Sequence, residues 1–433
     1  MGEKHQLPRT LLLVVAMAAI LVLSTLRSSK MLTQTTGMKP IDSGQAAIEK
    51  SKVETSGSLK KASSGTSLPT HDDFRPVTQL KGKDACTPDP HQPLRRISGL
   101  FPNYANASRF FNISSTDNMT LPLVCEFRND EAFFKHFAHA MQQLYGCYSY
   151  YQQEQHRHGS DQSDRAKILL LSGTMKKQLT SNPFLKGFLG VLRDQMAVEI
   201  MSRSDFLKEM GGEQSIGVAR LFVPGGYVIS HAEQLIEMVE TYISKTTTNS
   251  TLLKATKNDH CTFPRIGILN RRPSMGRSIQ NTNTIVKELV NLSFQQEIPV
   301  EYFEGKSFAE QVQFFQSVDI LLSPHGAQLT GLPFLAGASS TKCEQLLELF
   351  PDNYIIPAFY GSLARNSDIG YSYHYLSDRN SPTEADDAAL SANMGLRIGA
   401  RAANLCVDPD IMRSSVQNLV NDWAKCCRDG SIH

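Results

Sequence analysis

Short apolar runs alternate with segments of helical periodicity through most of the chain. In the first half the pattern predicts strands at 167–172 and 218–223, and helices at 131–145, 184–201 and 232–243. In the first of these helices, Phe137, Met141 and Leu144 recur at the spacing of one buried face. Strands that alternate with helices are typical of an α/β domain built on a parallel sheet.

The second half repeats this alternation and adds a helix start signal. Its predicted strands cover 265–269, 298–303, 318–322 and 345–350, and its predicted helices cover 284–292, 307–317 and 411–423. Ser307 and Glu310 form the capping-box pattern that opens a helix. We expect a doubly wound domain, in which ligands bind beyond the carboxyl ends of the strands.

A basic turn follows the strand predicted at 265–269 and contains Asn270, Arg271, Arg272 and Arg277. Guanidinium groups bind phosphate oxygens in pairs and stay charged at any working pH. We therefore predict that the three arginines bind the diphosphate of a nucleotide, with Asn270 in the same substrate-binding turn. Arginines placed there would also stabilise the charge that develops on a leaving diphosphate. The alternative is a solvated basic loop.

A second turn, rich in small residues, follows the strand predicted at 318–322. Gly326 and Ala327 would let backbone amides approach a ligand closely. A helix beginning near Leu329 would direct its amino terminus at a phosphate. We predict that His325 donates a hydrogen bond to a phosphate oxygen or contacts the sugar.

Four further residues are candidates for this site. Thr330 follows the second turn, and Glu348, near the end of the last strand, is predicted to accept hydrogen bonds from a ribose hydroxyl pair. His136 and His139 are three residues apart on a predicted helix and are therefore neighbours on its surface. Such a pair could supply a general base, and the alternative is ordinary surface or core histidine.

Patterns that resemble metal sites have simpler interpretations. The sequence 156–158, His-Arg-His, lies among polar residues and is interpreted as a solvated loop. Asp408 and Asp410 form an Asp-x-Asp pattern directly before the helix at 411–423, where Asp410 is a suitable N-cap. No Cys-x-x-Cys pair is present. We expect neither a metal nor another cofactor.

The amino terminus has the layout of a type II membrane protein. Residues 1–9 carry Lys4 and Arg9 and are predicted to form a cytoplasmic tail. Residues 10–26 are uncharged, just long enough for a transmembrane signal-anchor, and 27–85 are polar enough for a flexible stem. Such a short span suits a Golgi or endoplasmic reticulum membrane. The alternative is a cleaved signal peptide.

The net charge bears on nucleic-acid partners, and the cysteines and sequons bear on the compartment. A net charge of +2 argues against nucleic-acid binding. A luminal chain favours disulfides among the eight cysteines, with adjacent Cys426 and Cys427 paired to different partners. Five sequons would then lie in the lumen as glycosylation sites, at Asn106, Asn112, Asn118, Asn249 and Asn291.

These residues resemble glycosyltransferase family 61. The family includes plant xylosyl- and arabinosyltransferases and animal O-linked N-acetylglucosaminyltransferases of the secretory pathway. The resemblance rests on the Asn-Arg-Arg that ends the strand at 265–269, on Ser-Pro-His-Gly-Ala-Gln-Leu-Thr at 323–330, and on Glu-Leu-Phe-Pro at 348–351. It extends to the histidines of 136–139 and to the tyrosines of 371–375, and covers about 130–423.

The resemblance implies a GT-B architecture, with two Rossmann-type lobes facing each other across a cleft. We expect an N-terminal, acceptor-side lobe at 86–257 and a C-terminal, nucleotide-sugar lobe at 258–433. The final helix would cross back to the first lobe, and 378–403 is interpreted as a surface excursion. The implied reaction is inverting, metal-independent transfer from a UDP-sugar to a hydroxyl of a protein or polysaccharide.

The chain departs from the family pattern at Ala140, Gln328 and Gly331, where many members have an acidic residue, a glycine and an asparagine. Without the acidic residue, the candidates for the base that activates the acceptor hydroxyl are His136, His139, Asp194 and Asp205. A second hypothesis is an inactive homologue that binds glycans or nucleotide sugars in the lumen. A Rossmann-type oxidoreductase is disfavoured because no Gly-x-Gly-x-x-Gly follows a strand.

Overall fold

The computed structural model describes thirteen stretches of the chain, all beyond the predicted tail, anchor and stem. They are residues 86, 94–96, 111–113, 122–126, 136–158, 165–171, 181–209, 218–221, 226–247, 261–293, 297–335, 343–376 and 394–429. No helix within these stretches is long and apolar enough to cross a membrane. The signal-anchor predicted at 10–26 lies outside the described residues, as do Asn106, Asn118 and Asn249. Asn112 lies in a strand and Asn291 on an exposed helical face.

A six-stranded sheet forms the core of the second half, in the order β1-β11-β10-β9-β7-β8. Its strands are β1 (Leu94–Arg96), β7 (Ile266–Asn270), β8 (Val300–Tyr302), β9 (Ile320–Pro324), β10 (Gln345–Pro351) and β11 (Gly370–Leu376). All neighbours are parallel except β1, which pairs antiparallel with β11. Every residue of β7, β9 and β10 is buried, because helices cover both faces of a parallel sheet.

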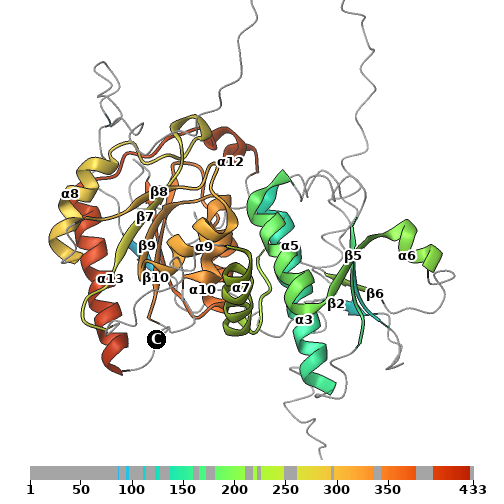
Figure 1. Cartoon of the computed structure of the whole chain (residues 1–433). Helices are drawn as coiled ribbons and strands as arrows, with labels where there is room; N and C mark the ends of the chain where they lie inside the picture. Colours follow the sequence, from blue (N-terminus) through green and yellow to red (C-terminus); the bar gives the residue numbers. More distant parts are fainter. Residues whose placement is uncertain are drawn as a thin grey trace, which may run out of the picture. The chain divides into compact units, whose positions relative to one another are not determined.

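Helices cover the two faces of this sheet. On one face, α8 (Thr282–Ser293) and α13 (Pro409–Asp429) lie side by side and share a core with the strands (Figure 1). On the other face lie α9 (Phe308–Gln316), the 3-10 helix η6 (Ala327–Phe334) and α10 (Pro357–Asn366). Ser307 caps α9 in the capping box that the sequence predicts. The final helix, α13, was expected to cross back to the first lobe. It packs instead on α8, on the six-stranded sheet of the second half.

A five-stranded sheet forms the first half, in the order β2-β6-β3-β4-β5. Its strands are β2 (Phe111–Ile113), β3 (Leu123–Glu126), β4 (Lys167–Leu171), β5 (Val198–Ser202) and β6 (Val218–Leu221), all parallel except β2. The helices α3 (Phe137–His158) and α5 (Pro183–Met196) share a core with one face, and α6 (Arg203–Glu209) with the other. Two mostly parallel sheets confirm the predicted α/β class.

Two helices end at other residues than the sequence predicts. The helix predicted at 184–201 ends at Met196, because Ala197 adopts a left-handed conformation (φ 54°) and the chain continues as β5. The helix predicted at 131–145 continues to His158, so 156–158 is the last helical turn rather than a loop. Residues 131–135 lie outside the described part of the chain. Strand β11, where we expected only a tyrosine-rich segment, was missed.

One buried apolar cluster joins the two halves. It contains residues of α3, α5 and α7 (Ala232–Thr246) together with residues of α9, η6 and α10. A Cβ on Gly187 of α5 would clash with the ring of Phe308, so this glycine lets α5 and α9 approach closely. The Tyr145 hydroxyl of α3 donates to the carbonyl of Thr330 at 2.7 Å. The first half is therefore anchored directly beside the second turn.

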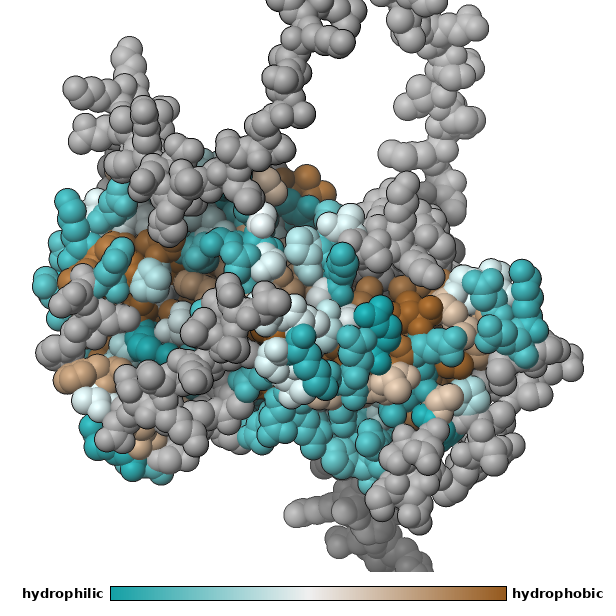
Figure 2. Space-filling model, in the orientation of Figure 1, coloured by the Kyte–Doolittle hydropathy of each residue, from teal (hydrophilic) through white to brown (hydrophobic). Residues whose placement is uncertain are grey.

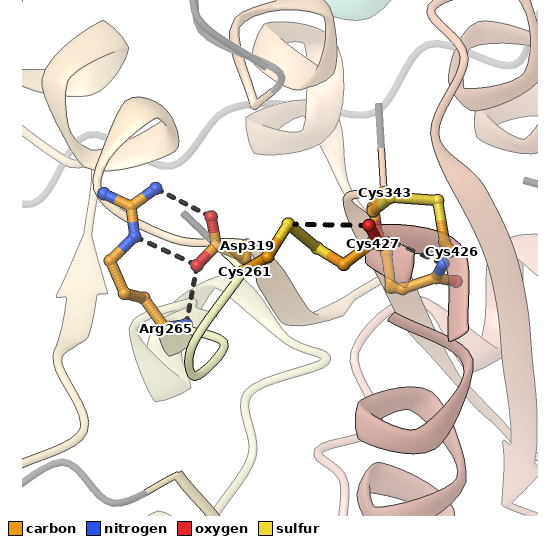
Figure 3. The surroundings of a disulfide bond; sticks show 7 residues. Cys261, Arg265, Asp319, Cys343, Cys426 and Cys427 are labelled. Atoms are coloured by element: carbon orange, nitrogen blue, oxygen red, sulfur yellow. Dashed lines mark hydrogen bonds and ion pairs between the residues drawn. A yellow bond between two sulfur atoms is a disulfide. The ribbon is translucent and has the colours of Figure 1, made fainter. Parts of the chain in front are cut away.

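All eight cysteines form disulfides. The pairs are Cys86–Cys406, Cys125–Cys147, Cys261–Cys427 and Cys343–Cys426. Cys426 and Cys427 therefore bind different partners, which confirms that prediction, and Figure 3 shows both bridges beside the Arg265–Asp319 ion pair. Both Cys86 and β1 belong to the stretch assigned to the first lobe, yet they connect to the second half.

A buried carboxyl lies at the amino ends of the strands of the six-stranded sheet. Glu344 is 4% exposed, and burial, followed by its neighbour Asp319, raises its pKa to about 7. Its Oε2 has no hydrogen-bond partner among the described residues. Because the folded-state pKa lies above that of the unfolded chain, folding binds a proton, and stability falls as the pH rises through 7.

We expect Glu344→Gln to flatten this dependence. The wild-type free energy of unfolding, measured with urea and intact disulfides, should be lower near pH 8 than near pH 5. The variant should recover up to about 3 kcal/mol of that difference at the higher pH. Glu199→Gln, which changes an exposed carboxylate on β5, is the control. Equal pH slopes in wild type and Glu344→Gln would contradict the assignment.

Candidate functional site

The basic turn is folded around Asn270, the last residue of β7. Its Nδ2 donates to the Ile279 carbonyl and to Thr282 Oγ1, both at 3.0 Å, and its Oδ1 accepts from the amides of Ile279 and Arg271. The side chain is 2% exposed. Asn270 therefore holds the turn closed, and its place in a substrate-binding turn stays a prediction.

Arg271 fastens the basic turn to the second turn. Its Nε and Nη2 donate to the carbonyls of Gly276 and Met275, and its Nη1 donates to Gln328 Oε1 at 3.1 Å. The Gln328 amide nitrogen in turn donates to the Pro324 carbonyl at 2.9 Å. Burial, followed by the neighbouring Arg277, lowers the pKa of Arg271 to about 10. Three of its five N–H groups are thus already used within the protein.

Arg277 and Arg272 differ from Arg271. Arg277 lies over the ring of Tyr354, 4.9 Å from the centroid, and its Nε is buried without an acceptor in the described part of the chain. Its backbone has φ 59°, and its amide donates to the carbonyl of Ala403. The Arg272 side chain is exposed, its backbone amide donates to Glu304, and its carbonyl accepts from the amide of Met275. Among the three predicted arginines, Arg277 has the guanidinium that most needs an anion.

His325 and Glu348 form a buried pair at the ends of β9 and β10. His325 Nδ1 lies 2.6 Å from Glu348 Oε1, and Tyr371 of β11 donates its hydroxyl proton to Oε2 of the same carboxyl. Burial raises the pKa of Glu348, and burial with the nearby Arg277 lowers that of His325, so the environment favours the uncharged form of both groups. Glu348 is fully buried with both oxygens engaged. In this structure the carboxyl positions His325, and its contact with a ribose stays a prediction.

The uncharged form of the pair has one tautomer of the imidazole. In that form the Glu348 carboxyl donates to Nδ1, and the ring proton of His325 lies on Nε2. No described residue forms a hydrogen bond with this Nε2. The ring is stacked on Phe350, with centroids 5.1 Å apart, and lies 5.2 Å from both Tyr354 and Tyr360. His325 is therefore a rigidly held donor of one N–H group.

The second turn continues as η6 from Ala327, where we expected a helix beginning near Leu329. Gly326 has extended backbone angles, and a Cβ there would clash with Arg271 Nη1 and with Gln328. Glycine is needed for this side-chain approach and not for an unusual backbone. The hydroxyl of Thr330 is buried and has no partner among the residues described.

His139 of the first half and His325 of the second both lie near the ring of Phe359. His139 is half-buried on α3, and its ring lies 5.5 Å from that of Phe359, which is 6.4 Å from His325. Its Nδ1 lies 3.3 Å from Gln142 Oε1, and burial is the main cause of its lowered pKa. His136 is exposed, and its carbonyl accepts from the first amides of α3.

Neither aspartate that we considered as a base joins this group. Asp194 is bound by Arg193 on the exposed side of α5. Asp205 accepts a hydrogen bond from Ser202 at the start of α6, which packs on the opposite face of the first sheet from α3. Of the candidate bases, His139 is the one whose ring shares the neighbour Phe359 with His325.

No sequence motif marks one further segment beside the site. This segment, residues 394–405, overlaps the surface excursion predicted at 378–403 and includes α12 (Met394–Ala400). Its last residues pair with the end of the basic turn. A Cβ on Gly276 would clash with the Arg401 carbonyl, and Leu405 pairs with Ile279. Two large apolar side chains, Met275 and Ile398, are 54% and 59% exposed here. Figure 2 shows a hydrophobic spot where Figure 1 places α12. The local sequence carries no signal for this pairing.

The Asp-x-Asp pattern caps a helix. Asp408 Oδ1 accepts hydrogen bonds from the amides of Asp410 and Ile411, so the cap is Asp408 and not Asp410 as predicted. Asp410 is exposed and lies 3.5 Å from Arg413. Within the described stretches there is no cluster of three or more metal-ligating side chains.

The chain is an α/β protein with two mostly parallel sheets, and guanidinium and imidazole groups gather at the carboxyl ends of the six-stranded sheet, where such folds bind ligands. The family model described as Glycosyltransferase 61 matches residues 122–341, slightly more than half of the 433 residues. The chain therefore belongs to glycosyltransferase family 61. Membership supports transfer of a glycosyl group from a nucleotide-sugar donor to an acceptor. No curated protein matches the chain.

We expect Gln328→Ala to destabilise the protein by about 1–2 kcal/mol, because the buried Arg271 Nη1 and the Pro324 carbonyl each lose a partner. The free energy of unfolding in urea measures this loss. Gln313→Ala on α9, where the glutamine has no hydrogen bond with a described residue, is the matched control. An equal effect of the two substitutions would contradict the role of Gln328 as a clamp.

Proposed function

We propose that the protein is an inverting, metal-independent glycosyltransferase that moves a sugar from a UDP-sugar to a hydroxyl of a protein or polysaccharide. The proposal includes a GT-B arrangement in which the second half binds the donor and the first half binds the acceptor. The observation that carries it is the convergence of Arg277 and His325 Nε2 at the carboxyl ends of β7 and β9. Both groups present N–H donors that no described side chain accepts.

The donor diphosphate would lie against Arg277 and His325. As the glycosyl bond breaks, the diphosphate gains negative charge, and a guanidinium held in place beforehand stabilises that charge without reorganisation. The Nε2–H of His325 would add a neutral hydrogen bond whose direction is set by Glu348. Because guanidinium groups supply the positive charge, the mechanism needs no divalent metal.

His139 would act as the general base on the acceptor hydroxyl. The Gln142 amide nitrogen donates to the Gly226 carbonyl, so Gln142 Oε1 faces His139 and accepts the Nδ1 proton. The lone pair then resides on Nε2, the nitrogen that can take a proton. The family's acidic position is occupied here by Ala140, which is 1% exposed, so a carboxylate there would be buried in α3.

The location of the protein is also proposed. A signal-anchor at 10–26 would place the catalytic part in the lumen of the Golgi or endoplasmic reticulum, with the acceptor delivered along the same membrane. The four disulfides support an oxidising compartment. Asn291 lies exposed on α8, which is compatible with glycosylation at that sequon.

A second candidate function rests on Gln328. This residue engages Arg271 Nη1, which a glycine at the same position would leave for a phosphate. An inactive homologue that binds glycans or nucleotide sugars would have tolerated such a change. Turnover separates this candidate from the enzyme.

We expect the purified full-length protein to hydrolyse at least one UDP-sugar slowly without acceptor, and to transfer the sugar when an acceptor hydroxyl is present. Release of UDP from a panel of nucleotide sugars, with and without a chelator, measures both the donor choice and metal independence. Tight binding without release of UDP would favour the inactive homologue. Activity that the chelator removes would overturn the metal-independent mechanism.

We expect His139→Gln to lower kcat at least about 100-fold with little change in KM for the donor. His136→Gln, three residues away on the exposed side, is the matched control and should lose much less. Because the pKa of His139 is lowered, the acid limb of kcat/KM should lie below pH 6.5. A larger loss in His136→Gln than in His139→Gln would reverse the assignment.

A further inference from the structure

The segment after α12 is fixed against the basic turn at several points. The amide of Arg277 donates to the Ala403 carbonyl at 2.8 Å, and the amides of Leu405 and Gln280 complete a short parallel pairing. Cys406 then binds Cys86 through a disulfide. These contacts hold the backbone of Arg401 directly against Gly276, so its position relative to the donor site is set by the fold.

The Arg401 side chain is exposed and forms no hydrogen bond or ion pair with a described residue. The backbone carbonyl of this residue lies against Gly276 of the basic turn, and its positive charge contributes to the lowered pKa of His325 and of His139. Arg401 therefore belongs to the segment that borders the basic turn, within electrostatic range of both histidines.

The arginines of the site divide into two kinds. Arg271 has acceptors on three of its N–H groups, all from the protein. The guanidinium groups of Arg277 and Arg401 have no acceptor in the described part of the chain. The backbone amide of Arg277 donates to the carbonyl of Ala403, two residues after Arg401. A diphosphate carries two or three negative charges, which suits two free guanidinium forks better than one.

We propose that Arg401 is a further substrate-binding residue, which binds the diphosphate of the nucleotide donor together with Arg277. The inference rests on the proposed function, since it names the partner of a diphosphate at the same strand ends. It makes residues 394–406, which no sequence motif marks, part of the donor site. The ligand chemistry is that of a nucleoside diphosphate, and UDP is the probe.

Calorimetric titration of the full-length protein with UDP, at one fixed ionic strength, tests the proposal. Arg401→Ala should weaken UDP binding about 10- to 100-fold, as expected for a lost charge-assisted hydrogen bond. Arg401→Lys keeps the charge but not the planar fork and should recover part of the affinity. Arg428→Ala is the control, because it removes the same charge from an exposed position on α13. That helix is tied by Cys426 to Cys343, at the opposite end of the sheet.

Arg277→Ala distinguishes the possible failures. If Arg277→Ala weakens UDP binding while Arg401→Ala behaves like Arg428→Ala, the role of Arg401 is wrong and the donor site stands. If neither variant changes the affinity, or the wild type does not bind UDP, the phosphate assignment of the proposed function is wrong as well. Urea unfolding of each variant identifies a loss of fold. Should Arg401→Ala not fold, Arg401→Lys is the test. This variant keeps the charge and loses the planar guanidinium, so wild-type affinity for UDP would contradict a hydrogen-bonded contact between the Arg401 guanidinium and the diphosphate.

Discussion

The candidate site depends on a carboxyl that is buried in the middle of a sheet. Glu348 lies on β10 between β9 and β11, and the two neighbouring strands supply the partners of its two oxygens, His325 and Tyr371. A buried carboxyl without such partners would be strongly destabilising, so the three side chains specify each other. In its uncharged form, which burial favours, the carboxyl satisfies these bonds without adding a negative charge to the site.

The two turns depend on this arrangement. With His325 fixed, Gly326 leaves room for Arg271, whose guanidinium links the basic turn to Gln328 and so sets the distance between the turns. Gly276, with φ 68°, lets residues 401–402 approach on the outside. Side chains from four separate stretches of the chain thus meet at one end of a sheet. Parallel strands make this possible because all their carboxyl ends lie at the same edge.

Local patterns predicted the elements whose environment is uniform. The strands β4, β7 and β9 are buried along their whole length and are therefore mostly apolar, which the sequence displays directly. The capping box at Ser307 is equally local. By contrast, β5 follows α5 after a single left-handed residue, and its Val-Glu-Ile-Met pattern also continues the helical period. Periodicity alone could not separate the two.

The sequence named most of the site residues but not their roles. Basic and glycine-rich turns after strands are local signals, so Arg277, His325 and Gly326 could be found. The role of Glu348 depends on strand register, because only pairing with β9 and β11 brings His325 and Tyr371 to it. Arg401 depends on a pairing between residues 279 and 405, which no short-range pattern encodes. Asn270 and Arg271 were recognised as part of the turn, but their contacts with the protein emerge only once the turn is folded.

The departures from the family motif acquire physical reasons in this setting. Gly331 lies where a Cβ would clash with the ring of Phe315, so a larger residue would separate η6 from α9. Gln328 uses both ends of its amide, and the arginine it engages is one that the basic turn also holds through two carbonyls. The guanidinium groups of Arg277 and Arg401 keep no acceptor among the described residues, and several arginines act as like charges on His325. A bound dianion would relieve their mutual repulsion. The same packing that replaces the motif residues therefore leaves positive charge at these strand ends that an anion could compensate.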